Sequence, residues 1–263
     1  MGPRVNIASR VARCLIGAVL AVTVVSGCSE ATPETQEPDD TATETTGNGS
    51  ATDPRDESSD GLSLEVVETA VTVTADSTGP MASYVVMLSN PSADIALYTD
   101  LEIRLLDGDG EPVTDLTADR DVVNRYAHLI MPGRTQAITE LTYVATDTVE
   151  SVDVSIDGTE WVSAQDDRFM PLSADDVTAT ADGNGATLTF TVDSPYTKEL
   201  TQVQTYAIFK DASGKLLGGS SATDVDPSTY VPGVNEVEID ISAGVPPEWD
   251  PESTEIYIDP FVE

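Results

Sequence analysis

The chain has 263 residues, with Lys+Arg 12 against Asp+Glu 47 and a formal net charge of −35. Such an acidic protein repels the phosphates of nucleic acids and of anionic lipids, so we expect no nucleic-acid partner. One histidine is too few for a His-rich zinc site, and we expect no free cysteine in the mature chain that could support Cys/His catalysis.

Residues 1–27 are predicted to be a lipoprotein signal peptide. Three arginines and no acidic residue precede an apolar run over residues 15–25. A charged start, a short apolar run and small residues before the cleavage point are typical of a secretory signal. The run is too short to span a bilayer as a mature helix.

The signal ends in Val25-Ser26-Gly27-Cys28, which resembles the bacterial lipobox of an aliphatic residue, a small residue, Gly or Ala, and Cys. This resemblance implies that the Cys28 thiol takes a diacylglyceryl group and that cleavage follows Gly27. Two acyl chains are enough to hold a protein at a membrane, here on its extracytoplasmic face. The alternative is an ordinary secretory signal with a chance cysteine. Because Cys14 leaves with the signal, the mature chain cannot form a disulfide.

Residues 28–60, which begin with the lipidated Cys28, are predicted to form a disordered acidic linker. From Ser29 to Asp60 there is no Ile, Leu, Val, Met, Phe, Tyr or Trp. A segment without apolar side chains cannot offset the entropy lost on ordering. We expect it to separate the folded part from the membrane.

The rest of the chain predicts an all-β fold of two tandem immunoglobulin-like antiparallel β-sandwiches, over residues 61–162 and 171–263. Apolar side chains alternate with polar ones, as in Leu101-Glu102-Ile103 and in Leu188-Thr189-Phe190. Period two with one polar face predicts half-buried antiparallel strands. Each half has room for about seven short strands, the number in an immunoglobulin-type sandwich.

The two halves also share ordered landmarks at a nearly constant spacing, which favours duplication. The matching pairs are Asp107–Gly110 with Asp211–Gly214, Pro132-Gly133 with Pro232-Gly233, and Ile156-Asp157 with Ile258-Asp259.

The run Ile103–Asp107, the following Gly-Asp-Gly, the later Met131–Gly133 and the turn at Asn90–Ser92 together resemble the FxLYD domain of bacterial secreted lipoproteins. Ile103 stands where that family has Phe, and Leu106 stands where it has Tyr. The resemblance covers residues 60–160 and, at fewer positions, 171–263. It implies an exported β-domain and supplies no catalytic residues.

Asp107, Asp109 and Glu111 form a weak calcium candidate, because hard cations prefer several carboxylate oxygens. An EF-hand loop counted from Asp107 would need Gly at its sixth position and Glu at its twelfth, where this chain has Pro112 and Ala118. The alternative is a β-hairpin in which an Asp-Gly turn provides a residue with φ > 0.

Arg120, Arg125, Tyr126 and His128 form a local basic cluster in an otherwise acidic chain. They are candidate contact residues for a carboxylate, a phosphate or a partner protein. The alternative is local charge compensation, which the sequence Asp119-Arg120-Asp121 suits well.

The sequence has no G-x-S-x-G motif and no glycine-rich phosphate loop, and no cofactor is implied. We therefore predict a non-enzymatic, surface-exposed bacterial lipoprotein that acts as a binding or spacer module. Its partners would be the membrane, through Cys28, and an unknown protein or small molecule. The first alternative is an accessory solute- or metal-binding subunit for a membrane partner. A cell-wall hydrolase comes third, because the many acidic residues are sufficient to supply a pair of catalytic carboxylates.

Overall fold

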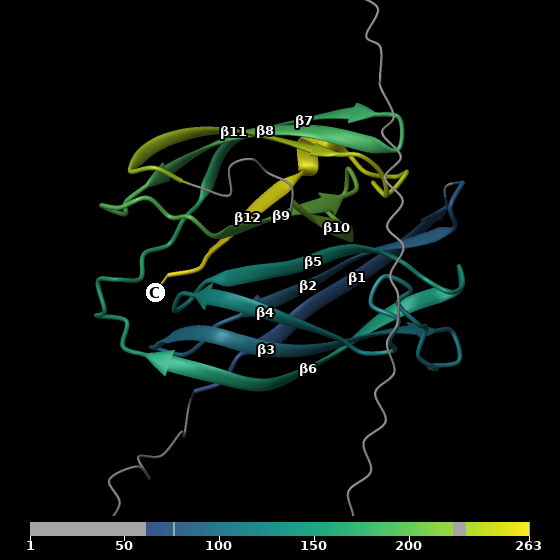
Figure 1. The fold of residues 1–263 in the computed structure, drawn as a ribbon, viewed down its shortest axis with the longest axis horizontal. Helices are drawn as coiled ribbons and strands as arrows, with labels where there is room; N and C mark the ends of the chain where they lie inside the picture. The colour runs from purple at the N-terminus through teal and green to yellow at the C-terminus, as the bar shows by residue number, and fades with distance from the viewer. Residues whose placement is uncertain (1–61, 76, 223–229, 263) are drawn as a thin grey trace, which may run out of the picture. The chain divides into compact units, whose positions relative to one another are not determined.

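The computed structural model describes residues 62–75, 77–222 and 230–262, which lie in one compact unit, Asp56–Glu263 (Figure 1). The predicted signal peptide, lipidation site and linker, residues 1–60, fall outside these ranges. The all-β prediction is confirmed, since the described residues form twelve strands in four three-stranded antiparallel sheets. Their only other regular element is a short 3-10 helix, η1 (Pro251–Ser253).

The first six strands form the first sandwich. They are β1 (Glu65–Ala75), β2 (Pro80–Ser89), β3 (Ile95–Asp107), β4 (Val123–Ile130), β5 (Thr135–Tyr143) and β6 (Val149–Val162). Sheet β1-β2-β5 packs on sheet β4-β3-β6. In β3 the predicted alternation places Leu101, Ile103 and Leu105 in the core between the sheets, while the residues between them are half-buried. Burial of these aliphatic side chains is the main force that holds the two sheets together.

The last six strands form the second sandwich. They are β7 (Ala174–Asp182), β8 (Gly185–Ser194), β9 (Val203–Lys210), β10 (Leu216–Ala222), β11 (Gly233–Ile241) and β12 (Glu255–Pro260). Sheet β11-β8-β7 packs on sheet β10-β9-β12, with Leu188, Phe190 and Phe209 in the core.

The two sandwiches have the same strand order. In each one the first, second and fifth strands form one sheet, and the fourth, third and sixth form the other. Each contains six strands in the described ranges, one fewer than the sequence predicted. The turns after β3 and β9 match, with Gly110 at φ 81° and Gly214 at φ 83°. Both turns have the positive φ that the hairpin interpretation required.

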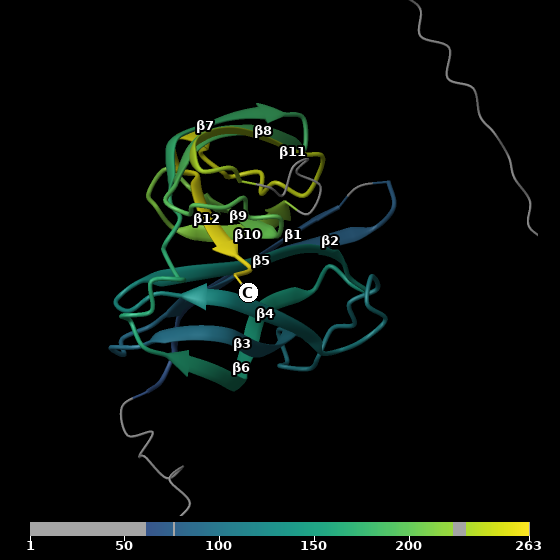
Figure 2. The same cartoon turned by 60° about the vertical axis from the view of Figure 1, so that its left-hand side comes forward.

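Strand β2 differs from the prediction of a half-buried strand, because every residue from Met81 to Leu88 is buried. Tyr84, Val86 and Leu88 share one face and pack in the core of the first sandwich. The opposite face is covered by the second sandwich, where Val85 and Met87 pack with side chains of β9 and β10. Sheet β1-β2-β5 therefore has an apolar layer on each side, and Figure 2 shows β5, β2 and β1 beneath β9 and β10.

Glycine and serine allow the two sandwiches to approach closely. Ser83 Oγ of β2 donates to the carbonyl oxygen of Gly219 at 2.9 Å and accepts from its N–H at 3.0 Å. A Cβ atom on Gly218 would lie 2.5 Å from the Ser83 carbonyl oxygen, closer than real Cβ contacts. Only glycine fits at this point without a shift of the backbone.

Candidate functional site

Three of the four predicted contact residues, Arg125, Tyr126 and His128, lie on β4, at the edge of sheet β4-β3-β6. The fourth, Arg120, lies in the loop between β3 and β4. Its main chain exchanges hydrogen bonds with Asp115, and its side chain is exposed. The structure therefore brings three candidates to one strand edge and leaves Arg120 apart from them.

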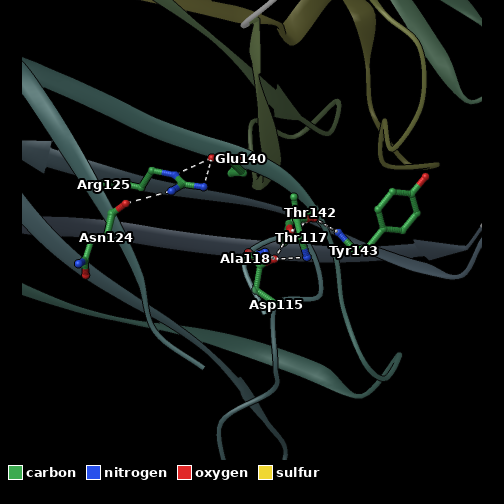
Figure 3. A network of polar contacts seen from close by, with 8 residues as sticks. All are labelled: Asp115, Thr117, Ala118, Asn124, Arg125, Glu140, Thr142 and Tyr143. Atoms are coloured by element: carbon green, nitrogen blue, oxygen red, sulfur yellow. Dashed lines mark hydrogen bonds and ion pairs between the residues drawn. The ribbon is translucent and has the colours of Figure 1, made fainter. Parts of the chain in front are cut away.

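The loop that carries Arg120 is fastened to β5 by a buried acid. Asp115 Oδ1 accepts hydrogen bonds from the N–H groups of Thr117 and Ala118 and from the Thr142 hydroxyl at 2.7 Å. Asp115 is 2 % exposed. Figure 3 shows this network beside the neighbouring ion pair of β4 and β5. The loop thus holds a fixed position next to the start of β4.

The ion pair joins Arg125 of β4 to Glu140 of β5, across the open edge of the first sandwich. Arg125 Nε donates to Glu140 Oε2 at 2.6 Å, and Arg125 Nη1 donates to the Asn124 carbonyl oxygen at 2.9 Å. Burial raises the pKa of the Glu140 carboxyl above its usual value, and the Arg125 charge opposes that rise. Both charged groups are engaged with each other, which limits their attraction for other ions.

The second interaction at β4 crosses between the two sandwiches. Asp259 of β12 is fully buried, and its carboxylate accepts from the N–H groups of His128 and Leu129 at 2.9 Å each. His128 Nδ1 lies 3.0 Å from Asp259 Oδ2. The hydrogen bond to Asp259 raises the pKa of His128 above its usual value, although burial opposes the rise. Asp259 therefore acts as a clamp that satisfies two donors at the free edge of β4.

Two cavities lie along β4, and His128 and Gln204 line both of them. We call them together the β4 cleft. The larger has a volume of about 330 Å³ and the smaller about 240 Å³. The larger is lined by Asn124, Arg125, Tyr126, His128, Thr139, Glu140, Gln204, Tyr206 and Ser221. The smaller is lined by His128, Gln202, Val203, Gln204, Ala222, Asp259 and Phe261. Each cavity takes lining residues from both sandwiches.

One hydroxyl at the larger cavity lacks a partner. Thr139 is 1 % exposed, and its Oγ1 makes no hydrogen bond within the described ranges. A buried hydroxyl without a partner costs about 1 to 3 kcal/mol. Because the oxygen atom itself is buried, a ligand in the cavity would not reach it without a movement of its neighbours.

The Asp259–His128 pair has the chemistry of two members of a hydrolytic triad, but no third member is assembled. Ser221 also lines the larger cavity. Among the described residues, no hydrogen bond joins Ser221 to His128, and His128 Nε2 makes none. What the geometry shows is a clamp between the sandwiches, beside the β4 cleft.

The calcium candidate is occupied by its own backbone. Asp107 Oδ1 accepts from the N–H groups of Asp109 and Glu111, both at 3.0 Å. The hairpin interpretation is confirmed, because Asp107 N–H also donates to the Glu111 carbonyl oxygen and the next residues pair back on β3. Across residues 62–75, 77–222 and 230–262, no group of three or more His, Cys, Asp or Glu is placed to hold a metal ion.

Among the residues of the cleft and clamp that sequence reasoning missed are Glu140, Gln204, Tyr206 and Asp259. They lie on three strands and come together only when the sandwiches pack. One signal was present, since Ile256-Tyr257-Ile258-Asp259 places an acid directly after three apolar residues. The charge pattern around β4 pointed to the other half of the cleft.

No helix in the part of the chain that the structure describes is long and apolar enough to cross a membrane. Comparison with known proteins identifies no relative, because no protein-family model and no curated protein matches this chain.

Proposed function

We propose that this protein is a lipid-anchored bacterial lipoprotein, displayed on the extracytoplasmic face of the cell membrane, which binds a partner and carries out no catalysis. The lipobox at Val25–Cys28 supports the anchor, and residues 29–60 supply a polar spacer. The resemblance to the FxLYD domain supports the same location. The two sandwiches, immunoglobulin-like in this proposal, would be the part that makes contact.

The β4 cleft is the observation that supports a binding role over a purely spacing one. It combines three predicted contact residues of the first sandwich with Gln204 and Tyr206 of the second. Tyr126 is 52 % exposed and lines the larger cavity, so its ring is accessible to a partner. Because hydrogen bonds and apolar packing fix the sandwiches to each other, the two walls of the cleft are preorganised.

The anchor is tested by detergent phase partition and by the mass of the mature N-terminus. We expect the protein in the detergent phase, beginning at an acylated Cys28. Cys28→Ala should move it to the aqueous phase, whereas Cys14→Ala, within the signal, should leave the partition unchanged. An unacylated protein that keeps residues upstream of Cys28 would contradict the proposal.

The binding role is tested by a photo-crosslinking residue placed in the full chain at Tyr126 in living cells. Tyr143 is the matched control, because it is 37 % exposed and lines neither cavity of the cleft. Figure 3 shows its ring turned away from the Arg125–Glu140 pair. We expect crosslinks to an envelope component from position 126 and none from position 143. Identical products from both positions would leave only the spacer role.

The volume of the larger cavity favours a second candidate, an accessory subunit that binds a small solute for a membrane partner. Pockets for small ligands begin at about 300 Å³ and contain a few well-placed polar groups. The larger cavity, at about 330 Å³, meets that lower bound. A membrane transporter or receptor recovered together with the crosslinked protein would support this candidate.

A further inference from the structure

We propose that the larger cavity of the β4 cleft binds a neutral sugar ring. This inference rests on the proposed binding function and names the chemical class of the ligand. It combines the size of the cavity, the balance of charge within it and the kinds of groups on its walls. Each of these properties argues against a different class of ligand.

The paired charges on the cavity wall argue against an ionic ligand. The cation on the wall, Arg125, is bonded to Glu140, and His128 is bonded to Asp259. The charges of Arg125 and Glu140 compensate each other, and a protein of net charge −35 repels anions at long range. Neither carboxylate is free to attract an ammonium group. A neutral ligand meets none of these penalties.

The polar side chains on the cavity wall next favour a ligand that can form hydrogen bonds. Asn124 and Gln204 offer amide donors and acceptors, and Ser221 offers a hydroxyl. A ligand that carries several groups able both to donate and to accept would satisfy this wall.

The aromatic side chains supply the remaining feature. Tyr126 and Tyr206, from opposite sandwiches, both line the larger cavity, and Tyr126 presents much of its ring to solvent. A pyranose has hydroxyl groups around its rim and an apolar C–H face, so it can pack against a ring while its rim meets amides and hydroxyls. Water in the liquid takes about 30 Å³ per molecule. A cavity of about 330 Å³ therefore exceeds a single hydration site and suits one hexose.

The test is saturation-transfer NMR on the mature, full-length protein in detergent micelles. The probes are glucose, galactose and N-acetylglucosamine at millimolar concentration, with glucuronate and glucosamine as the anionic and cationic counterparts. We expect transfer to the C–H protons of at least one neutral sugar and weaker transfer to its charged counterparts. Tyr126→Ala and Gln204→Ala should each weaken binding by about tenfold, as expected when a central contact is removed. Tyr143→Ala should bind like the unmodified protein.

Two results would overturn the assignment. One is the absence of transfer to all three neutral sugars, and the other is equal binding by the Tyr126→Ala and Tyr143→Ala variants. If the sugars fail while position 126 still crosslinks to an envelope protein, the sugar assignment is wrong and the proposed function stands. If the mature chain carries no acyl group, the proposed function fails, whatever the sugars do.

Discussion

The first and second sandwiches have the same strand order, yet their fourth strands are used in opposite ways. Strand β4 carries the bulky side chains Arg125, Tyr126 and His128 along an open cleft. Strand β10 carries Gly218, Gly219 and two serines, and it lies directly against the first sandwich. The same position in the fold therefore lies along a cleft in the first sandwich and packs against the neighbouring sandwich in the second.

The sixth strands diverge in a similar way. Ile156 of β6 pairs with Leu101, and Ile258 of β12 pairs with Thr205 at the corresponding place in the second sandwich. The next residue is aspartate in both strands, but Asp157 is exposed and Asp259 is fully buried. One acid remains in solvent, while its counterpart clamps β4. The contrast shows that the partner surface, and not the strand itself, decides what the residue does.

The packing also joins unlike sheets, since sheet β1-β2-β5 of the first sandwich meets sheet β10-β9-β12 of the second. An interface between unlike faces can in principle be repeated without end. The outward face of the second sandwich is unfavourable for docking a further sandwich in this way, because β11 exposes Glu236, Glu238 and Asp240 there. Like charges on such a face oppose the docking of another acidic sheet.

The largest effect should come from the two aspartates. Asp259→Ala removes the acceptor for two backbone donors and for His128, so we expect a loss of about 3 kcal/mol in the free energy of unfolding. Asp157→Ala, the matched control, should change it by less than about 0.5 kcal/mol. Urea denaturation of both variants measures the difference. Equal losses would mean that the clamp contributes nothing beyond an ordinary surface acid.

The second largest effect on stability is expected at the close contact between β10 and β2. In Gly218→Ala the new methyl group would meet the Ser83 carbonyl oxygen, and overpacking of this kind costs about 2 kcal/mol. Gly158→Ala on β6 is the control, because a Cβ there meets nothing within 4 Å. It should leave stability unchanged within about 0.5 kcal/mol. A Gly218→Ala variant as stable as the control would show that the sandwiches are packed less tightly than described.

The sequence predicted the strands of each sandwich better than it predicted how the two sandwiches pack on each other. Alternation in strands such as β3 gave the core face, and Gly110 and Gly214 marked turns that need positive φ. Both signals are local, so a single stretch of chain contains them. The packing of the two sandwiches on each other had one local signal in the sequence, the unbroken apolar run of residues 84–88. Such a run is typical of a strand buried on both faces. Nothing in that run shows which surface covers it.

The candidate site divides in the same manner. Arg125, Tyr126 and His128 stood out because positive charge is rare in this chain. Glu140 could not stand out among so many acids, and Asp259 looked like a solvent-exposed strand residue. Their roles depend on contacts with β4 from distant parts of the chain, and the packing of the two sandwiches creates the Asp259 contact. Spacing along the sequence does not encode such contacts.

A smaller effect is expected from pH, through the only histidine of the chain. The pKa of His128 is raised above 6.5 in the folded protein, so folding favours the protonated ring. The stabilisation is complete below that ordinary value and is lost as the pH rises through the higher folded value. We expect about 1 kcal/mol, because the side chain is 28 % exposed and solvent weakens the pair.

Urea denaturation as a function of pH measures this effect. His128→Gln keeps a donor near Asp259 but does not titrate, so the loss of stability attributed to His128 should be absent from this variant. Glu140, whose pKa is also raised, is present in both proteins and cancels in the comparison. A slope that persists in His128→Gln would assign the pH dependence to another group.

The smallest effect is expected at the turns after β3 and β9, where the two sandwiches have similar structures. Asp107 and Asp211 each accept hydrogen bonds from two backbone N–H groups in the turns after β3 and β9. Alanine at either position should lower the midpoint of thermal unfolding slightly and by similar amounts, less than Gly218→Ala does. Asp109→Ala is the control, because its side chain makes no hydrogen bond within the described ranges. Asp211 also accepts from the Ser213 hydroxyl at 2.6 Å, so a loss at Asp211 smaller than that at Asp107 would contradict this account of the turns.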